Sequence, residues 1–387
     1  ELPLLKEILM NCAYMIYFMF LLFFTNFGGS NRQAKKVWQI TKITIIARMC
    51  RKNIKNSAKA VLTSISAFLL CISAYSQNSW NDYAPARNML TEEKLENQIG
   101  FLADSLCQGR GIGTRGGVET SSWVAREFEK AGLLKTDSTW FKSFVSEKGD
   151  YGRNVIGMLP GGNPDCSSYI IVGAHFDHLG TLDGKHYPGA DANASGTVAL
   201  TNIAEMLSVM KDTVGKRYAS NIIFIGFDGK EADMAGSKAI WNMISSGQFR
   251  DPVTGKAITS KQISLMVNID QIGASLSPLR PDRPDYIIML GNHRIKPSKR
   301  DQLYMCNRLY ITHLDLGFDY YGSENFTKIF YRLSDQRVFI DHGIPSVLFT
   351  SGITMKTNKT YDNAASLDYP VLRKRILLMF HWIEKML

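Results

Sequence analysis

Three segments between residues 169 and 237 constrain the fold more than any other part of the chain. They read YIIVGAHFDHLG, GADANASGTVAL and NIIFIGFDGKEADMAGS, and each has acidic, histidine or glycine residues beside an apolar run or a helix start. The first and the third begin as strands without polar alternation, which is typical of the middle of a parallel sheet. Open α/β sheets bind their ligands at the carboxyl ends of such strands. The segments therefore predict an α/β protein with metal ligands at one edge of its sheet.

Predicted strands and helices alternate along the body of the chain. The predicted strands are 141–145, 153–159, 169–174, 221–227, 262–269, 286–290 and 343–349. The predicted helices are 91–106, 118–132, 195–210, 236–246, 298–309 and 371–387, and residues 318–330 are predicted to form a long loop. This alternation favours a sheet with helices on both faces. Because no internal repeat or low-complexity linker interrupts it, we expect one domain over residues 77–387.

The positive charge of the chain is concentrated at its front. The formal net charge is +10, and residues 1–76 contain ten Lys or Arg but only two acidic residues. The remainder contains 35 basic and 33 acidic residues and is nearly neutral. A nearly neutral body argues against a nucleic-acid partner.

Two apolar runs precede the body. The run at 12–27 has sixteen residues, fewer than the about 20 that a membrane helix needs. From Met49 onward, basic residues, the apolar run 60–74 and a small-x-small site before Gln77 form a complete secretory signal peptide. We therefore expect residues 49–76 to be a signal peptide and the body to be exported to the periplasm or outside the cell. Residues 1–48 are then an upstream extension, or alternatively contain a membrane segment.

The body, about residues 90–387, resembles the secreted co-catalytic-zinc aminopeptidases, the metallopeptidase family that also contains the glutaminyl cyclases. The motifs that carry the resemblance are Gly109–Gly117, His175–Asp177, Gly189–Gly196, Phe227–Ser237, Asn268–Gly273, Ser334–Asp335 and Gly343–Pro345. The resemblance implies a three-layer α/β/α sandwich with a mostly parallel, mixed central sheet. It also implies two zinc ions that activate a water and polarise the scissile carbonyl, and a glutamate that takes the proton from this water.

Three of the five metal ligands that the resemblance implies are present. They are His175, Glu231 and Asp270, and Asp177 is the residue that would orient the His175 imidazole. In the family arrangement these three ligands are divided between the two metal ions. Neither ion would therefore keep a full protein shell in this chain.

The other family positions are substituted. Ala192 stands at the bridging carboxylate, with Asp191 one residue away, and Lys230 stands at the general base. A gapless reading puts Asn358 at the last histidine ligand, whereas a gapped reading puts Asp362 there. Gln336 likewise replaces the histidine of the Ser-Asp-His motif.

These substitutions predict weak or no peptidase activity and fewer than two zinc ions. The possible metal ligands are His175, Glu231 and Asp270, joined by Asp191, Asn358 or Asp362. Lys230 is hypothesised to be an internal counter-ion for the acidic residues that a lost metal would leave behind. The expected partner is the amino terminus of a peptide or protein in the cleft. Three alternatives stay open: a non-catalytic binding relative, a glutaminyl-cyclase-like acyltransferase, and a single-metal hydrolase that uses His175 and Asp270, with Asp191 as an optional third ligand.

Overall fold

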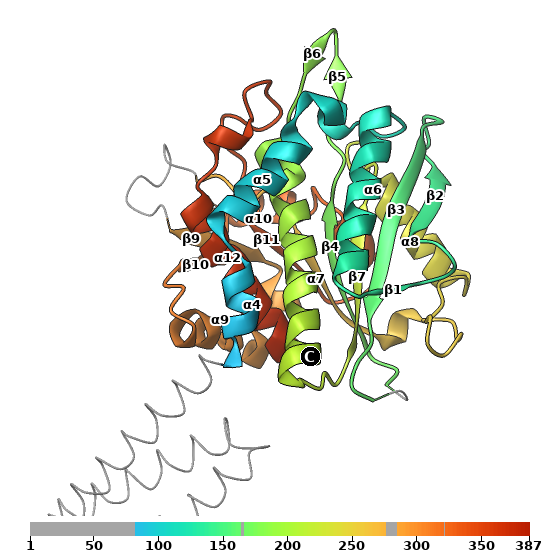
Figure 1. The fold of residues 1–387 in the computed structure, drawn as a ribbon, viewed down its shortest axis with the longest axis vertical. Coiled ribbons are helices and arrows are strands. Elements are labelled where there is room, and N and C mark those ends of the chain that lie inside the picture. Colours follow the sequence, from blue (N-terminus) through green and yellow to red (C-terminus); the bar gives the residue numbers. More distant parts are fainter. Residues whose placement is uncertain (1–81, 164–165, 276–284, 321) are drawn as a thin grey trace, which may run out of the picture. The chain divides into compact units, whose positions relative to one another are not determined.

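The computed structural model describes residues 82–163, 166–275, 285–320 and 322–387 (Figure 1). The predicted signal peptide at 49–76 and the predicted extension or membrane segment at 1–48 lie outside these residues. Among the described helices, none combines the length and the apolar character that a bilayer crossing requires.

A mixed sheet forms the centre of the described structure. Its strands follow the order β1 (Leu134–Lys135), β3 (Tyr151–Leu159), β7 (Asn221–Phe227), β4 (Tyr169–His175), β8 (Ile263–Ile269), β11 (Ser346–Thr350), β9 (Tyr286–Leu290) and β10 (Asp315–Gly317). A further strand, β2 (Phe141–Val145), pairs with β3, and β5 (Thr181–Leu182) and β6 (Lys185–His186) form a separate hairpin. The four central strands β7, β4, β8 and β11 are parallel, and β3 and β9 run antiparallel to their neighbours in this group.

Helices cover both faces of this sheet (Figure 1). They are α4 (Ala84–Met89), α5 (Glu92–Ala103), α6 (Arg115–Lys130), α7 (Ser195–Val214), α8 (Ala235–Ser245), α9 (Pro297–Leu309), α10 (Glu324–Phe330), α11 (Gln336–Asp341) and α12 (Tyr369–Met386). Helix α7 packs against α4, α6 and α12 on one face. Helices α8 and α11 contact each other, and their apolar side chains join a core cluster with β3, β4 and β7. The predicted three-layer α/β/α sandwich with a mostly parallel, mixed sheet is thereby confirmed.

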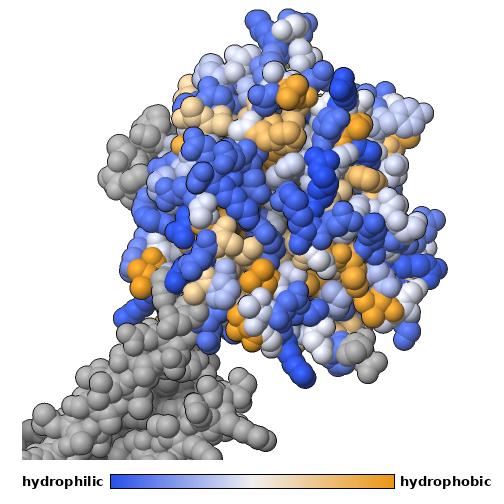
Figure 2. Space-filling model, viewed as in Figure 1, coloured by the Kyte–Doolittle hydropathy of each residue, from blue (hydrophilic) through white to orange (hydrophobic). Residues whose placement is uncertain are grey.

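Sequence patterns explain why the central elements form. All seven residues of β4 and all seven of β7 are buried, as expected for strands with helices on both sides. Helix α5 begins after Thr91, whose hydroxyl accepts a hydrogen bond from the Lys94 backbone N–H at 3.1 Å. Its buried residues recur at helical spacing. The face of the molecule that carries α5, α6 and α7 is mostly hydrophilic, with hydrophobic side chains in small scattered groups (Figure 2).

One predicted loop is wrong. Within residues 318–330 the chain forms α10, and the Ser323 hydroxyl caps this helix by accepting from the Phe326 backbone N–H at 3.3 Å. The last residue of α10, Phe330, stacks on Tyr320 with ring centroids 3.9 Å apart. This aromatic contact stabilises a helix of 7 residues, which is too short to give a clear apolar period.

Candidate functional site

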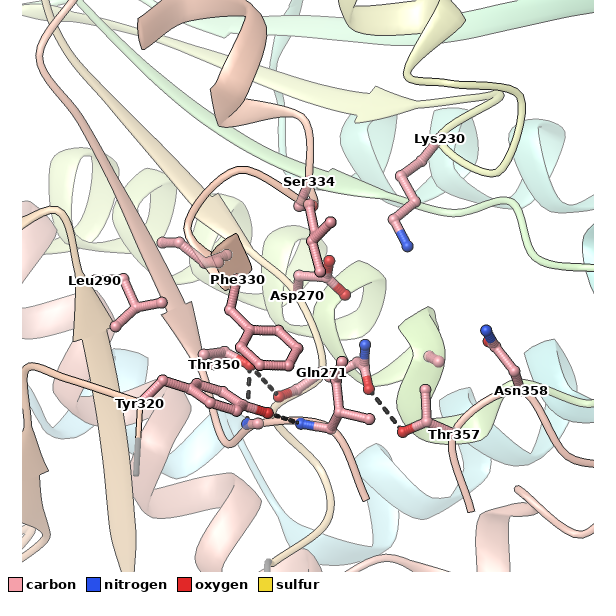
Figure 3. Close-up of a pocket in the computed structure, with 15 residues that line it drawn as sticks. Lys230, Asp270, Gln271, Leu290, Tyr320, Phe330, Ser334, Thr350, Thr357 and Asn358 are labelled. Atoms are coloured by element: carbon pink, nitrogen blue, oxygen red, sulfur yellow. Dashed lines mark hydrogen bonds between the residues drawn. The ribbon is translucent and has the colours of Figure 1, made fainter. Parts of the chain in front are cut away.

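The predicted site residues meet at the carboxyl edge of the sheet. His175 ends β4, Asp270 directly follows β8, and Lys230 and Glu231 follow β7. Because β4, β7 and β8 are parallel neighbours, their ends lie side by side and bring these side chains together. Figure 3 shows the Lys230 amino group and the Asp270 carboxylate directed into the same cavity.

His175 and Asp270 form a buried pair. The Nε2 atom of His175 lies 3.2 Å from Oδ1 of Asp270, and its Nδ1 atom lies 3.5 Å from Oδ1 of Asp177. Burial opposes the charged imidazole, but the Asp270 charge and the contacts with both carboxylates outweigh it and raise the pKa of His175 to about 10. Burial likewise opposes the charged form of Asp270, but the His175 charge holds its pKa well below the usual range. The two residues therefore stabilise each other as an ion pair.

Lys230 and Glu231 form a second pair. The Nζ atom of Lys230 lies 2.9 Å from Oε1 of Glu231. The Asp177 carboxylate accepts hydrogen bonds from the backbone N–H groups of both residues at 3.0 Å, which positions this loop against the end of β4. Burial opposes the Lys230 charge, but the nearby charges of Asp270 and Glu231 raise the pKa of Lys230 above its usual value. Lys230 therefore carries a proton and cannot act as a general base at neutral pH.

One residue of each pair, Asp270 and Lys230, lines a cavity of about 220 Å³. It is lined by Ala192, Lys230, Asp270, Gln271, Leu290, Tyr320, Phe330, Leu333, Ser334, Leu348, Thr350, Gly352, Ile353, Thr357 and Asn358. Three substituted family positions, Ala192, Lys230 and Asn358, thus face the same cavity as Asp270. The cavity therefore presents a methyl group, an ammonium group and an amide where the resemblance implies two metal ligands and a base.

Asp191 and Asp362 do not line this cavity but hold the turn before α7. Oδ1 of Asp191 accepts from the backbone N–H groups of Gly273 at 2.7 Å and Ala274 at 3.2 Å. The Asp362 carboxylate accepts from the backbone N–H groups of Asp191 at 3.0 Å and Ala192 at 3.2 Å. Burial, with a smaller contribution from Asp362, raises the pKa of Asp191 to about 7. Both possible replacement ligands are thus used to connect loops.

Gln336 is also placed away from the cavity. Its Oε1 atom accepts from the Asn268 amide at 2.7 Å, and its amide donates to the Tyr331 carbonyl at 2.6 Å. The same Asn268 amide donates to the Ser334 hydroxyl, which does reach the cavity wall. Gln336 therefore links Asn268 of β8 to the Tyr331 carbonyl outside the cavity.

Two residues that hold the site in place were not predicted from the sequence. The fully buried Arg110 guanidinium donates to four backbone carbonyls, those of Leu102, Phe176, Pro188 and Gly189, at 2.6–2.8 Å. The Asn193 amide donates to the carbonyls of His175 at 3.2 Å and Ile269 at 2.9 Å and so joins the ends of β4 and β8. The glycine-rich sequence around Arg110 predicted that another backbone segment packs closely against this loop. It did not identify the carbonyls that Arg110 binds, because they are backbone groups far away in the sequence.

The residues present do not fit a two-zinc centre. In the stretches that the structure describes, no group of three or more His, Cys, Asp or Glu side chains is arranged to hold a metal ion. Zinc sites in proteins use at least three such ligands. His175 and Asp270 are adjacent, but Glu231 is paired with Lys230 instead of completing a cluster with them.

The α/β/α sandwich has the fold of solved zinc-dependent exopeptidases. The sequence matches Peptidase family M28 over residues 154–383, so the chain belongs to this family. A probable leucine aminopeptidase of Arthroderma otae is 25% identical over 195 residues, which are 49% of this chain and 46% of that protein. The chain thus spans less than half the length of this curated relative.

Solved structures share the fold. The LapA aminopeptidase of Legionella pneumophila is 16% identical, with a TM-score of 0.59 over 79% of this chain and 74% of that chain. A glutaminyl cyclase of Fimbriiglobus ruber is also 16% identical, with a TM-score of 0.57 over 76% of this chain and 95% of that chain. The expected membership in the family that contains aminopeptidases and cyclases is confirmed, and zinc-dependent exopeptidases are among the proteins with this fold.

Proposed function

We propose that this chain is an exported M28-family protein with weak or no peptidase activity, whose cleft binds ligands that carry a free α-amino group. One observation carries the proposal. The Lys230 ammonium lines the cavity at the position that the resemblance gives to the general base, and it is paired with Glu231 at 2.9 Å. The group that should accept a proton is thereby replaced by one that can only donate.

Each substitution removes a separate part of the hydrolytic machinery. The Ala192 methyl group has no atom that can bridge two metal ions, and the Asn358 amide is a poorer zinc ligand than an imidazole. A positioned general base alone contributes about 10²–10⁴-fold to a rate. We therefore expect fewer than two zinc ions per chain and aminopeptidase turnover lower by orders of magnitude than a complete site would give.

The occupant that the cleft suits is the amino terminus of a peptide or protein. Asp270 lines the cavity and supplies negative charge for an α-ammonium group, and apolar residues on the opposite wall suit the first side chain. Export through the signal peptide at 49–76 would place the protein among extracellular or periplasmic peptides. A nearly neutral body gives no reason to expect nucleic acid as a partner.

Metal analysis combined with an activity assay tests the proposal. The purified chain is dialysed against zinc, its metal content is measured by mass spectrometry, and release of p-nitroaniline from leucine p-nitroanilide is followed. We expect well under one zinc per chain and no release above the level of a Glu231→Gln, Asp270→Asn double variant. Stoichiometric zinc with hydrolysis that Glu231→Ala abolishes would contradict the proposal and restore an ordinary exopeptidase.

A further inference from the structure

One border of the central sheet is an open edge strand. Strand β2 pairs with β3 on one side, and no described strand pairs with its other side (Figure 1). Ser143 and Val145 of β2 are exposed, Val145 to 58%. An edge of this kind offers its backbone N–H and C=O groups to a further strand.

The pairing of β2 with β3 fixes which backbone groups point outward. The Trp140 carbonyl accepts a hydrogen bond from the Ile156 N–H at 2.8 Å. Bonded positions alternate along an antiparallel pair, so residues 142 and 144 also bond to β3. The residues between them, Ser143 and Val145, therefore direct their N–H and C=O groups away from the sheet.

The usual protection of a sheet edge is weak at this strand. Natural edge strands are blocked by outward lysines, prolines or bulges. The only charged residue of β2 is Lys142, and its side chain is 14% exposed and paired with Asp137 of the same chain. The Phe141 N–H is already satisfied by the Thr139 hydroxyl at 3.2 Å. The outward groups of Ser143 and Val145 thus define the part of the edge that suits a partner strand.

We propose that β2 pairs antiparallel with β2 of a second copy of this chain, with a two-fold axis at Ser143, so that the two sheets become continuous. In this register the Ser143 N–H of each copy donates to the Ser143 carbonyl of the other copy. The Val145 N–H of each copy donates to the Phe141 carbonyl of the other. The pairing needs no donor from Phe141, whose N–H is engaged by Thr139.

The side chains around Ser143 favour a second copy over an unrelated strand. Val145 of one copy lies beside Phe141 of the other, and an aromatic residue opposite a β-branched one stabilises an antiparallel pair. Tyr151, the β3 neighbour of Val145, is 79% exposed and extends the apolar row. Asp137 and Lys148 are exposed on opposite sides of Ser143, so antiparallel pairing brings the acid of one copy toward the base of the other. Both contacts occur twice in a two-fold dimer.

The expected association is weak and independent of the cavity. An edge of 5 residues buries little surface, and small interfaces are typical of transient complexes, so we expect a dissociation constant in the micromolar range. None of the residues that line the cavity belongs to β2. The state of association therefore tests this surface without testing the proposed function.

Sedimentation velocity of the full chain tests the pairing with two matched variants. The unaltered chain should pass from monomer to dimer as its concentration rises from the micromolar to the submillimolar range. Ser143→Pro removes an outward N–H without breaking a bond to β3, and it should weaken association at least roughly tenfold because both copies lose a hydrogen bond. Ser143→Ala keeps the N–H and should associate like the unaltered chain. Equal association of the two variants would overturn the proposal, and a monomer at every concentration would assign the edge to a strand of another protein.

Oxidative cross-linking tests the register and decides the matter if Ser143→Pro does not fold. Opposed hydrogen-bonded residues of an antiparallel pair have Cα atoms about 5.5 Å apart, a separation that a disulfide can span. Ser143→Cys should therefore form a covalent dimer under mild oxidation. Lys359→Cys, at an exposed position outside β2, should form no more of it than the unaltered chain, whose own cysteines set the background. Equal cross-linking of the two variants, or none in Ser143→Cys, would contradict pairing at Ser143.

Discussion

Lys230 and Glu231 are neighbours in sequence whose side chains turn back on each other, with Nζ and Oε1 2.9 Å apart. Both are partly buried, with 17% and 23% of their side chains exposed. A carboxylate in such a place is costly unless it is paired. The pair therefore supports the hypothesis that Lys230 replaces, as an internal counter-ion, part of the positive charge that metal ions supply in a complete site.

The first prediction concerns the stability that this pair contributes. Lys230→Ala should lower the free energy of unfolding by about 1–3 kcal/mol, between the values for exposed and fully buried pairs, because Glu231 and Asp270 lose a nearby cation. Lys238→Ala is the control, since this lysine pairs with the exposed Glu147 and Asp233 and should cost less than about 1 kcal/mol. Urea unfolding measures both. Equal losses in the two variants would show that Lys230 is not a counter-ion.

The second prediction restores the family residues. A triple variant with Ala192→Asp, Lys230→Glu and Asn358→His should be less stable than the native chain without metal, because it adds carboxylates to the cavity. With zinc at 100 times its dissociation constant it should gain about 2.7 kcal/mol. Thermal unfolding with and without zinc measures the change.

The control for this restoration removes one conserved ligand. The same triple variant with Asp270→Asn should not respond to zinc, and the unaltered chain should show little change in melting temperature when zinc is added or chelated. A zinc response of equal size in the unaltered chain would mean that the substituted positions do not limit metal binding.

Much of the fold could be predicted because apolar runs and turn residues are local features. The strands at 141–145, 221–227 and 286–290 have the bounds that were predicted for them. Helices α4, α10 and α11 were missed, since each is short and depends on contacts with the rest of the chain, such as the stacking of Phe330 on Tyr320.

The site could be predicted where its residues follow parallel strands, because such strand ends meet at one sheet edge. His175 and Asp270 are brought together in this way. The hydrogen-bond partners of the Asp191 and Asp362 carboxylates could not be predicted, since both residues lie in irregular segments and accept from backbone N–H groups of other loops. Neither periodicity nor motif spacing specifies such partners.

The third prediction tests the buried arginine that supports the site. Arg110→Ala should destabilise the protein by at least about 3 kcal/mol, because it leaves four backbone carbonyls without their donor. Arg115→Ala, at an exposed position in the first turn of α6, should change stability by less than about 0.5 kcal/mol. Urea unfolding compares the two, and a small effect at Arg110 would mean that water replaces its hydrogen bonds.

The last prediction concerns acid sensitivity and His381 in α12. This side chain is 2% exposed and stacks on Tyr310 with ring centroids 3.4 Å apart. Burial, together with the charges of Lys385, Arg87 and Lys216, lowers the pKa of His381 well below 6.5. The unfolded chain, with an ordinary histidine pKa of about 6.5, then binds a proton that the folded chain does not bind. Stability from this residue is present above pH 6.5 and is lost as pH falls below that value, by up to about 1.4 kcal/mol per pH unit.

Replacing the titratable ring should remove this dependence. His381→Phe keeps an aromatic ring against Tyr310 and should give a shallower loss of stability between pH 7 and pH 5 than the native chain. His313→Asn is the control, because His313 is exposed and its φ of 51° suits asparagine, so the native pH slope should be retained. Unfolding free energies from urea titrations at each pH provide the slopes. An unchanged slope in His381→Phe would assign the acid sensitivity to other buried groups, since the charge on His381 would then not differ between the folded and unfolded chains.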